Sequence, residues 1–306
     1  MSYSLNRMYN ALDTTRQAFH SKVDRFMRKE EELEQLCMIM DQFRSDHPGM
    51  SLRDAYYVIK PSCVGRDKFE SYFQEHGYGV GRKASFIRTT NSNGVIRFPN
   101  LIGGIKLTGV NQVWVSDITY YLMGEAFYYL TFITDLFSRR ILGYIASKTL
   151  LTEYTTIPAM RMALKERGKT KIPGLIIHSD GGGQYYSKAF RKITKAAGMN
   201  NSMGKSVYEN PHAERVNGII KNNYLKHYNP VSFSELIIKL KKAVKMYNEQ
   251  KPHAALKRLS PVDYEEKTNI EIQNNFASYF RIPTLNHHKE SIFENKFLIQ
   301  KPVNVI

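Results

Sequence analysis

The sequence is poor in cysteine and has no long apolar segment. Its 306 residues include two cysteines, Cys37 and Cys63, too few for a disulfide framework or a zinc knuckle and typical of the reducing cytosol. Because no run of about 18 apolar residues occurs, the sequence predicts no transmembrane helix. The N-terminus also lacks a positively charged segment followed by an apolar one, so we expect no secretory signal.

Acidic side chains are scarce relative to basic ones. The chain carries 44 Lys and Arg against 28 Asp and Glu, a formal charge of +16. Residues 101–266 hold 24 basic and 13 acidic side chains, a net charge of +11, whereas the segments before and after carry +3 and +2. An excess concentrated in one segment indicates a polyanionic partner, most simply nucleic acid. The apolar fraction of 42% is sufficient for a folded core and excludes wholesale disorder.

Residues 1–80 are predicted to form a helical N-terminal region. Apolar side chains recur at helical spacing from Phe19 to Phe43. The following sequence His47-Pro48-Gly49 should end that helix, because proline disfavours helix in the residue before it and glycine frees the backbone. The run of glutamates inside this segment is expected to form a solvated face.

Two shorter helices are expected over 52–59 and 67–76, around a tight turn. They allow two interpretations: a helix-turn-helix that places its second helix in a DNA groove, or a helical module that packs or binds a partner protein. Residues 81–110 are predicted to be a basic linker, in which Arg82 and Lys83 could follow a DNA backbone.

The hydrophobic pattern changes after residue 111 from helical to strand-like. Three β-branched and aromatic segments separated by short turns predict an antiparallel meander. The predicted order continues with helices and short strands: strands over 113–121, 126–134 and 141–146, a helix over 152–167, a strand over 174–178, a helix over 187–197, a strand over 201–203, and helices over 211–227 and 232–249. This order predicts an α/β fold, a ribonuclease H-like mixed five-stranded sheet flanked by helices, over residues 111–266.

Three carboxylates lie where such a fold would place a metal site. Asp117 lies inside an apolar strand, where an ionised group is costly unless it is paired or bound to metal. Asp180 ends the fourth strand and precedes three glycines, and Glu214 lies one turn into the long helix. Oxygen ligands of this kind suit Mg²⁺ or Mn²⁺, and two such ions can clamp the attacking and leaving oxygens of a phosphoryl displacement. The three residues are therefore candidate metal ligands and catalytic residues.

Other polar residues near these carboxylates are candidate DNA contacts. Lys221 lies seven residues after Glu214, on the same helix face, where it could grip a phosphate. We expect Arg215 and Asn217 to point away from the helix face shared by Glu214 and Lys221, and they could also touch DNA.

Several neighbouring residues allow more than one interpretation. Asp135 is expected to be a turn residue or the partner of an arginine. His178 and His212 lie beside two of the carboxylates and could either orient water or DNA or have a structural role. Tyr185 is expected to pack in the core rather than stack on a base.

Five motifs over residues 111–264 resemble the catalytic core of retroviral integrases and insertion-sequence transposases. They are NQVWVSDITY (111–120), TDLFSR (134–139), HSDGGGQY (178–185), ENPHAERVNG (209–218) and YNEQKPH (247–253). The chain most resembles the second-frame (orfB) product of two-frame bacterial insertion sequences. The resemblance implies a DDE triad of Asp117, Asp180 and Glu214, two Mg²⁺ or Mn²⁺ ions, and cutting and joining of DNA at transposon ends.

The same resemblance implies partners and a location. These are element-end and target DNA, a homo-oligomer assembled on DNA, a first-frame helix-turn-helix protein, and the bacterial cytoplasm near the nucleoid. The sequence departs from the family pattern in two places: only 33 residues separate Asp180 from Glu214, slightly fewer than usual, and residues 267–306 form a tail with no match. Two other functions remain open: a DNA-binding protein derived from a transposase whose metal site is unused, and a hydrolytic nuclease of the same fold.

Overall fold

The structure is a computed structural model that describes residues 5–81, 98–204 and 210–279, the last eight of these without their side chains. The chain divides into two units, residues 1–267 and 268–306. Within the described ranges no helix is long and apolar enough to cross a membrane. The predicted DNA contacts Arg82 and Lys83 lie outside the described residues, as do parts of the expected linker and tail.

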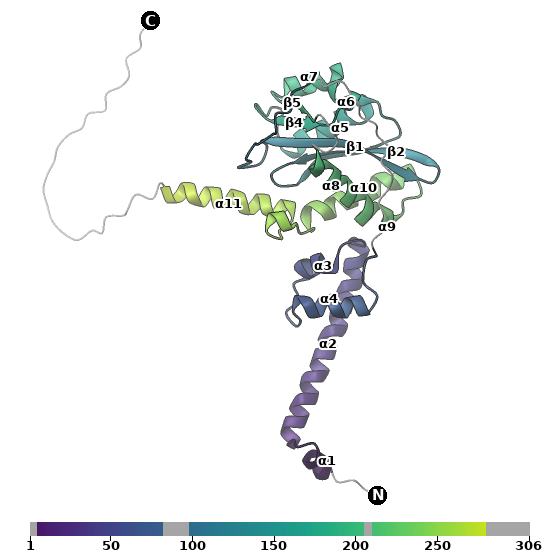
Figure 1. The fold of residues 1–306 in the computed structure, drawn as a ribbon, viewed down its shortest axis with the longest axis vertical. Helices are drawn as coiled ribbons and strands as arrows, with labels where there is room; N and C mark the ends of the chain where they lie inside the picture. Colours follow the sequence, from purple (N-terminus) through teal and green to yellow (C-terminus); the bar gives the residue numbers. More distant parts are fainter. Residues whose placement is uncertain (1–4, 82–97, 205–209, 280–306) are drawn as a thin grey trace, which may run out of the picture. The chain divides into compact units, whose positions relative to one another are not determined.

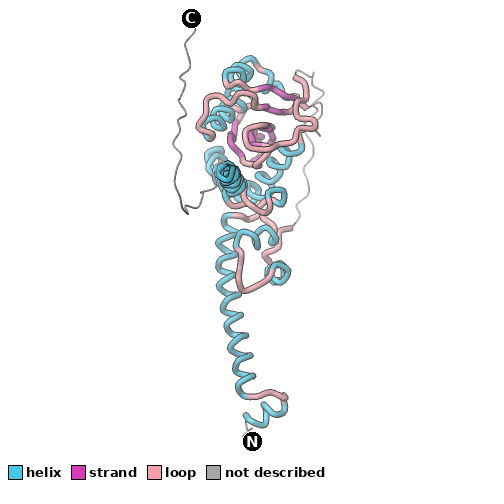
Figure 2. The backbone as a smooth tube through the Cα atoms, turned by 90° about the vertical axis from the view of Figure 1, so that its left-hand side faces the viewer, coloured by secondary structure: helices cyan, strands magenta, loops and turns pink. Residues whose placement is uncertain are grey.

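The described chain before the first strand contains only helices and loops, as predicted (Figure 2). The helices are α1 (Leu5–Ala11), α2 (Arg16–Asp46), α3 (Leu52–Ile59) and α4 (Arg66–Glu75). The side chains of Thr15 and Ser51 cap α2 and α3 by accepting hydrogen bonds from the backbone N–H groups of Ala18 and Asp54. Helix α2 ends immediately before His47, and α3 and α4 agree with the predicted helices to within one residue.

The C-terminal half of α2 carries the main core of this region, whereas its N-terminal half contacts α1 through Tyr9. The C-terminal half joins α3 and α4 in a small core in which Met40, Phe69 and Phe73 are fully buried. In the N-terminal half, Phe19 is 36% exposed and Phe26 is 62% exposed. The apolar spacing therefore predicted the helix correctly, but it did not indicate that α3 and α4 cover only one end of it.

Five strands form one mixed sheet in the order β3-β2-β1-β4-β5. They are β1 (Val113–Met123), β2 (Ala126–Asp135), β3 (Ile141–Ser147), β4 (Ile176–Ser179) and β5 (Asn200–Met203). Strands β1 to β3 pair antiparallel, whereas β4 pairs parallel with both β1 and β5. This topology confirms the predicted ribonuclease H-like sheet.

Helices cover both faces of this sheet (Figure 1). The elements are η1 (Thr152–Tyr154), α5 (Thr156–Glu166), α6 (Gly183–Tyr186), α7 (Lys188–Ala196), α8 (Pro211–Ile219), the π-helical segment η3 (Ile220–Leu225), α9 (Lys226–Tyr228), α10 (Phe233–Glu249), η4 (Ala254–Leu256) and α11 (Pro261–Tyr279). Helices α5 and α7 pack on one face around the fully buried Trp114. Helix α8, η3 and α10 pack on the other face, around Tyr224 and Tyr247.

Three helices differ from the prediction. The helix expected over 152–167 is divided at Thr155 into η1 and α5. The helix expected over 211–227 contains the wider turns of η3, a feature often found at functional sites. Helix α11 was not predicted, although Ser260 caps it by accepting from the Asp263 N–H at 3.2 Å and Pro261 begins it. The core boundary expected at residue 266 therefore lies inside a helix.

The π-helical segment η3 also contacts the helical region. The Gly49 N–H donates to the carbonyl oxygen of Asn223 at 3.0 Å, and a Cβ added at Gly49 would lie 2.6 Å from the Asn223 Cα. The His47 ring bonds the Tyr224 hydroxyl at 3.2 Å and the Gln250 side-chain oxygen at 2.7 Å. Only glycine permits this approach, so the turn after α2 fixes where the helical region meets the core.

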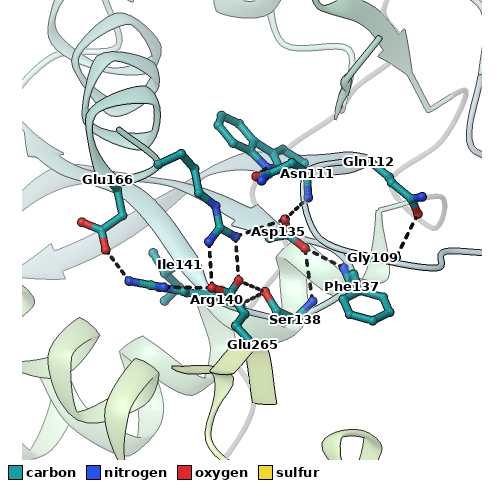
Figure 3. Close-up of polar contacts among 12 residues, drawn as sticks. Gly109, Asn111, Gln112, Asp135, Phe137, Ser138, Arg140, Ile141, Glu166 and Glu265 are labelled. Carbon is teal, nitrogen blue, oxygen red and sulfur yellow. Dashed lines mark hydrogen bonds and ion pairs between the residues drawn. The ribbon is translucent and has the colours of Figure 1, made fainter. Parts of the chain in front are cut away.

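A buried network of charges joins the start of α11 to the sheet (Figure 3). The Asp135 carboxylate is fully buried and accepts from Asn111 N–H at 2.7 Å and from Arg167 at 3.3 Å. Glu265 accepts from Ser138 and Arg167, both at 2.6 Å, and from Arg140 at 2.8 Å. Asp135 is thus both a turn residue and an arginine partner, so the two interpretations offered for it are both correct.

Replacing Glu265 with glutamine should destabilise the fold. Burial alone would raise the pKa of Glu265, but its bonds from Arg167, Ser138 and Arg140 outweigh burial and lower it. The neutral side chain would leave Arg167 buried without its main partner, at a cost of about 3–5 kcal/mol. Urea denaturation at pH 7 measures this, with Glu166→Gln as the control, because exposed pairs such as Glu166 with Arg140 contribute about 1 kcal/mol or less. Equal losses of unfolding free energy in the two variants would contradict the role of Glu265 as the main partner of Arg167.

Replacing Gly143 with alanine should also lower stability. A Cβ at Gly143 in β3 would lie 2.0 Å from the carbonyl oxygen of Ala159 in α5. Helix α5 must move away from the sheet to accommodate it, and overpacking of this kind costs about 1–3 kcal/mol. Gly103→Ala, which meets nothing within 4 Å, is the matched control and should change thermal stability little. A Gly143→Ala protein as stable as this control would show that the contact is not tight.

Candidate active site

The parallel pairing of β1 with β4 brings the first two candidate carboxylates together. The register pairs Ser116 with Ser179, so Asp117 and Asp180 are the next residues on adjacent strands. The Asp180 carboxylate accepts from the Gly182 N–H at 3.1 Å. A Cβ at Gly182 would lie 3.1 Å from that carboxylate, so the glycine allows the turn to fold closely onto it.

The surroundings of Asp117 raise its pKa. Burial is the main cause that raises the pKa of Asp117 to about 7, and the negative charges of Asp180 and Glu214 raise it further. The backbone N–H of Ile118 and the side chain of Asn217 act in the opposite direction. Burial also raises the pKa of Asp180. The structure therefore gathers more negative charge around Asp117 than its own neighbours neutralise.

The third carboxylate comes from helix α8, which packs on the face of the sheet toward which the Asp117 side chain points. Glu214 lies in the first turn of α8, and its side chain is exposed. The residue before α8, Asn210, donates from its side-chain nitrogen to the carbonyl oxygen of Ser116 at 3.0 Å. This bond holds the start of α8 beside Asp117. Sequence reasoning missed Asn210, although an asparagine directly before a helix-starting proline is a recognisable signal.

Asn217 occupies a different place from the one predicted. It is not turned away from the carboxylates, because its side-chain nitrogen donates to the Asp117 carboxylate at 2.6 Å. It is also buried, with 4% of its surface exposed. Residues three apart share a helix face, so Asn217 and Glu214 both face β1. Asn217 thus contacts the candidate catalytic carboxylate and is closed to solvent.

Lys221 lies near the same carboxylates. Its ammonium donates to the Thr119 hydroxyl at 2.7 Å and to the Tyr120 carbonyl oxygen at 3.3 Å. Burial lowers the pKa of Lys221, and the charge of Asp117 partly opposes that effect. Arg215, by contrast, is exposed. The structure thus separates these two predicted DNA contacts, with Lys221 held against β1.

The two histidines beside the carboxylates make bonds within the protein. His178 is fully buried, and its Nδ1 bonds the Ser202 hydroxyl at 2.9 Å. His212 bonds Arg139 at 2.6 Å, and burial, with the nearby charges of Arg139 and Arg215, lowers its pKa to about 4. These contacts favour the structural interpretation of both residues. Tyr185 is buried, as predicted.

The donor atoms of this site suit a hard divalent cation. Asp117, Asp180 and Glu214 supply only oxygen ligands, and the buried Asp117 carboxylate has no positively charged hydrogen-bond partner in the described part of the chain. Among the residues described, however, no three His, Cys, Asp or Glu side chains are arranged to hold a metal ion. The sheet brings the two aspartates together. The exposed Glu214 does not complete a three-carboxylate group with them.

Comparison with known proteins identifies the family of this chain. Two family models, both described as integrase core domain, match residues 108–207 and 198–261. The 31 kDa protein of insertion element IS600 from Shigella sonnei is 34% identical over 209 residues, which are 67% of this chain and 76% of that protein. The chain belongs to the insertion-sequence transposases with an integrase core domain. The IS904 transposase of Lactococcus lactis is 28% identical to this transposase over 193 residues, covering 62% of this chain and 75% of that one.

A solved structure is also similar to the core of this transposase. It is the HTLV-2 integrase catalytic core domain in complex with magnesium, at 23% identity and a TM-score of 0.43. The match covers 51% of this chain and 97% of that domain.

The pKa of Asp117 predicts an effect on stability. Its value of about 7 in the fold exceeds the value of about 3.9 expected in the unfolded chain, so the folded state binds the proton more tightly. The free energy of unfolding should therefore decrease as the pH rises from about 4 through about 7. Asp117→Asn removes the buried charge, and we expect it to raise the melting temperature at pH 8, but not at pH 4, when EDTA is present. A melting temperature lowered equally at both pH values would contradict the charge assignment.

Proposed function

We propose that this transposase catalyses metal-dependent cleavage of DNA at insertion-sequence ends and transfer of the cut strand to target DNA. Asp117, Asp180 and Glu214 are the proposed catalytic residues. The observation that supports this best is geometric: the parallel register of β1 and β4 sets Asp117 beside Asp180. Asn210 and Asn217 bond Ser116 and Asp117, and so hold the helix that carries Glu214 against the same strand.

The same three carboxylates are the proposed ligands for Mg²⁺ or Mn²⁺, taken up as two ions. When bound, the metal supplies activation of an attacking hydroxyl and stabilisation of the leaving oxygen. Asp117 and Asp180 supply ligands from neighbouring strands. Glu214 is exposed on the first turn of α8, so its side chain has room to turn toward them.

The other residues of the site position these carboxylates and the substrate. The Asn217 amide holds one oxygen of Asp117, which leaves the second oxygen to bind a cation. Asn210 fixes the start of α8 against β1 and so limits where Glu214 can reach. Lys221 places a positive charge beside β1, where a DNA phosphate can replace the Thr119 hydroxyl as its partner. Arg215, Arg82 and Lys83 remain proposed contacts to the DNA backbone.

The partners follow from the same proposal. The substrates are element-end and target DNA, held by a homo-oligomer, with a first-frame helix-turn-helix protein as a further partner. We propose that residues 1–80 bind DNA or this partner, that 81–110 link them to the core, and that 111–266 carry the catalysis. A nuclease that cuts without joining, or a DNA-binding protein with an unused site, is the alternative. The presence of all three carboxylates in the sequence favours the transposase over the DNA-binding protein with an unused site.

Substitution of the carboxylates tests the proposal. Asp117→Asn, Asp180→Asn and Glu214→Gln should each reduce end cleavage and strand transfer by at least about a thousandfold, since metal-ion catalysis contributes several kcal/mol. Binding of element-end DNA should persist in each variant. The assay follows cleaved and joined products on labelled DNA with Mg²⁺ or Mn²⁺.

Glu125→Gln is the matched control, because Glu125 is exposed in the turn between β1 and β2 and far along the strand from Asp117. It should retain wild-type activity. Strand transfer by any of the three site variants would refute the assignment. Cleavage without joining by the wild-type protein would favour the nuclease.

A further inference from the structure

The outer face of α5 and α7 carries a second concentration of positive charge, separate from Lys221. Eight basic side chains on these helices and the loop after α5 are all exposed: Arg161, Lys165, Lys169, Lys171, Lys188, Arg191, Lys192 and Lys195. We call them the α5/α7 basic face. Both helices pack on the same face of the sheet and contact each other. The loop joins them, because its Ile172 N–H donates to the Ala197 carbonyl oxygen at 2.8 Å, just after α7.

The charges of the α5/α7 basic face are not neutralised within the described part of the chain. None of the eight side chains takes part in an ion pair or a side-chain hydrogen bond there. Within residues 152–197, Glu166 pairs with Arg140 and Asp180 belongs to the candidate active site, so Glu153 is the remaining acidic side chain.

The lysines on the opposite face of the sheet provide a contrast. On α10, Lys239 pairs with Glu235 at 2.8 Å and Lys245 with Glu249 at 3.9 Å. Helix α7 has no acidic residue at all. Helix α10 therefore pairs three of its four lysines, the third being Lys242 with Asp46. Helix α7 pairs none of its four basic side chains with another described residue, which indicates that α7 meets an anion from outside.

The spacing along α7 suits the backbone of a nucleic acid. Lys188, Arg191, Lys192 and Lys195 follow the i, i+3, i+4, i+7 pattern of one helix face. They span about 10 Å, because each residue adds about 1.5 Å. Phosphates of one strand of a duplex advance about 3.4 Å along the axis per nucleotide, so this row faces about three of them. The other exposed residue of α7 is Ala196, which cannot read a base edge.

The row of basic side chains on α7 begins near the C-terminal end of β4, which is the end of the sheet where Asp180 lies. Helix α7 connects β4 to the parallel strand β5, so it must run back against the direction of β4. Its N-terminal end, with Lys188, therefore lies toward the end of β4, where Asp180 follows. Duplex DNA lying along α7 would approach the candidate active site from the face opposite α8.

We propose that the α5/α7 basic face binds duplex DNA through its phosphates, without reading its sequence. The proposal rests on the proposed function, and it adds a second DNA surface to that function. Joining requires the enzyme to hold an element end and a target together. A surface of unpaired lysine and arginine, with no acidic or amide side chain among the exposed residues of α7, fits the phosphates of the target duplex. The phosphate chemistry is shared with the element end, so the experiment must distinguish the two.

The test compares two variants that each lose three positive charges. Arg191→Gln/Lys192→Gln/Lys195→Gln changes α7, and Lys239→Gln/Lys241→Gln/Lys245→Gln is the matched control on α10. Binding of the full chain to a 30-base-pair duplex of random sequence is measured from 50 to 300 mM salt, with EDTA to prevent catalysis. Each phosphate contact adds about 0.9 to the slope of log affinity against log salt. We expect the α7 variant to lose about 2–3 units of slope, and the control less than about 1.

The outcomes separate this inference from the proposed function. A slope lost only by the α7 variant supports the surface, even if the protein proves inactive in strand transfer, because EDTA excludes chemistry. A second duplex, which carries an element end, shows whether the phosphates bound by this face belong to target DNA or to the element end. If the α7 variant loses slope on both duplexes, the binding is independent of sequence. If it loses slope on the element-end duplex alone, the surface binds the element end. Equal slopes for the two variants on both duplexes would overturn the proposal. Thermal melts verify folding, and the three single variants replace the triple one if it does not fold.

Discussion

The parallel pairing of β1 with β4 is the contact on which the candidate active site depends. It aligns Ser116 with Ser179, and the next residue on each strand is an aspartate. Burial is the main reason that the pKa of Asp117 rises to about 7, and repulsion from the charges of Asp180 and Glu214 raises it further. The hydrogen bonds of the sheet and the apolar core around Trp114 hold the pair in place against that repulsion.

The sheet alone does not complete the site, because Glu214 belongs to helix α8. Two asparagines bring that helix to β1. Asn210 bonds the backbone of Ser116, and Asn217 bonds the carboxylate of Asp117. The π-helical segment η3 continues from α8, and the Gly49 N–H bonds its Asn223 carbonyl. The helix that carries Glu214 is thus tied both to the sheet and to the helical region.

Charge is distributed in this fold in three different ways. In the interior, Asp135, Arg167 and Glu265 pair with one another and join α11 to the sheet. At the candidate active site, carboxylates gather without enough positive partners. On the α5/α7 basic face, lysines and arginines gather without acidic partners. The first arrangement stabilises the fold, and the other two create surfaces suited to a cation and to a phosphate backbone, respectively.

The sequence by itself determined the order of the strands along the chain and most helix boundaries, because hydrophobic period and turn residues are local properties. Family motifs made Asp117, Asp180 and Glu214 the candidate carboxylates. The sequence also located the positive charge on the 101–266 segment. It could not show that Asn217 faces Asp117, since the orientation of a helix about its axis is set by packing. Nor could it show that Phe19 and Phe26 are exposed. It did not reveal which lysines are paired, because Lys239 on α10 and Lys192 on α7 look alike in a sequence. Only the tertiary structure decides which side chains share a surface, as the contacts that neutralise a charge or orient a carboxylate join residues far apart in the chain.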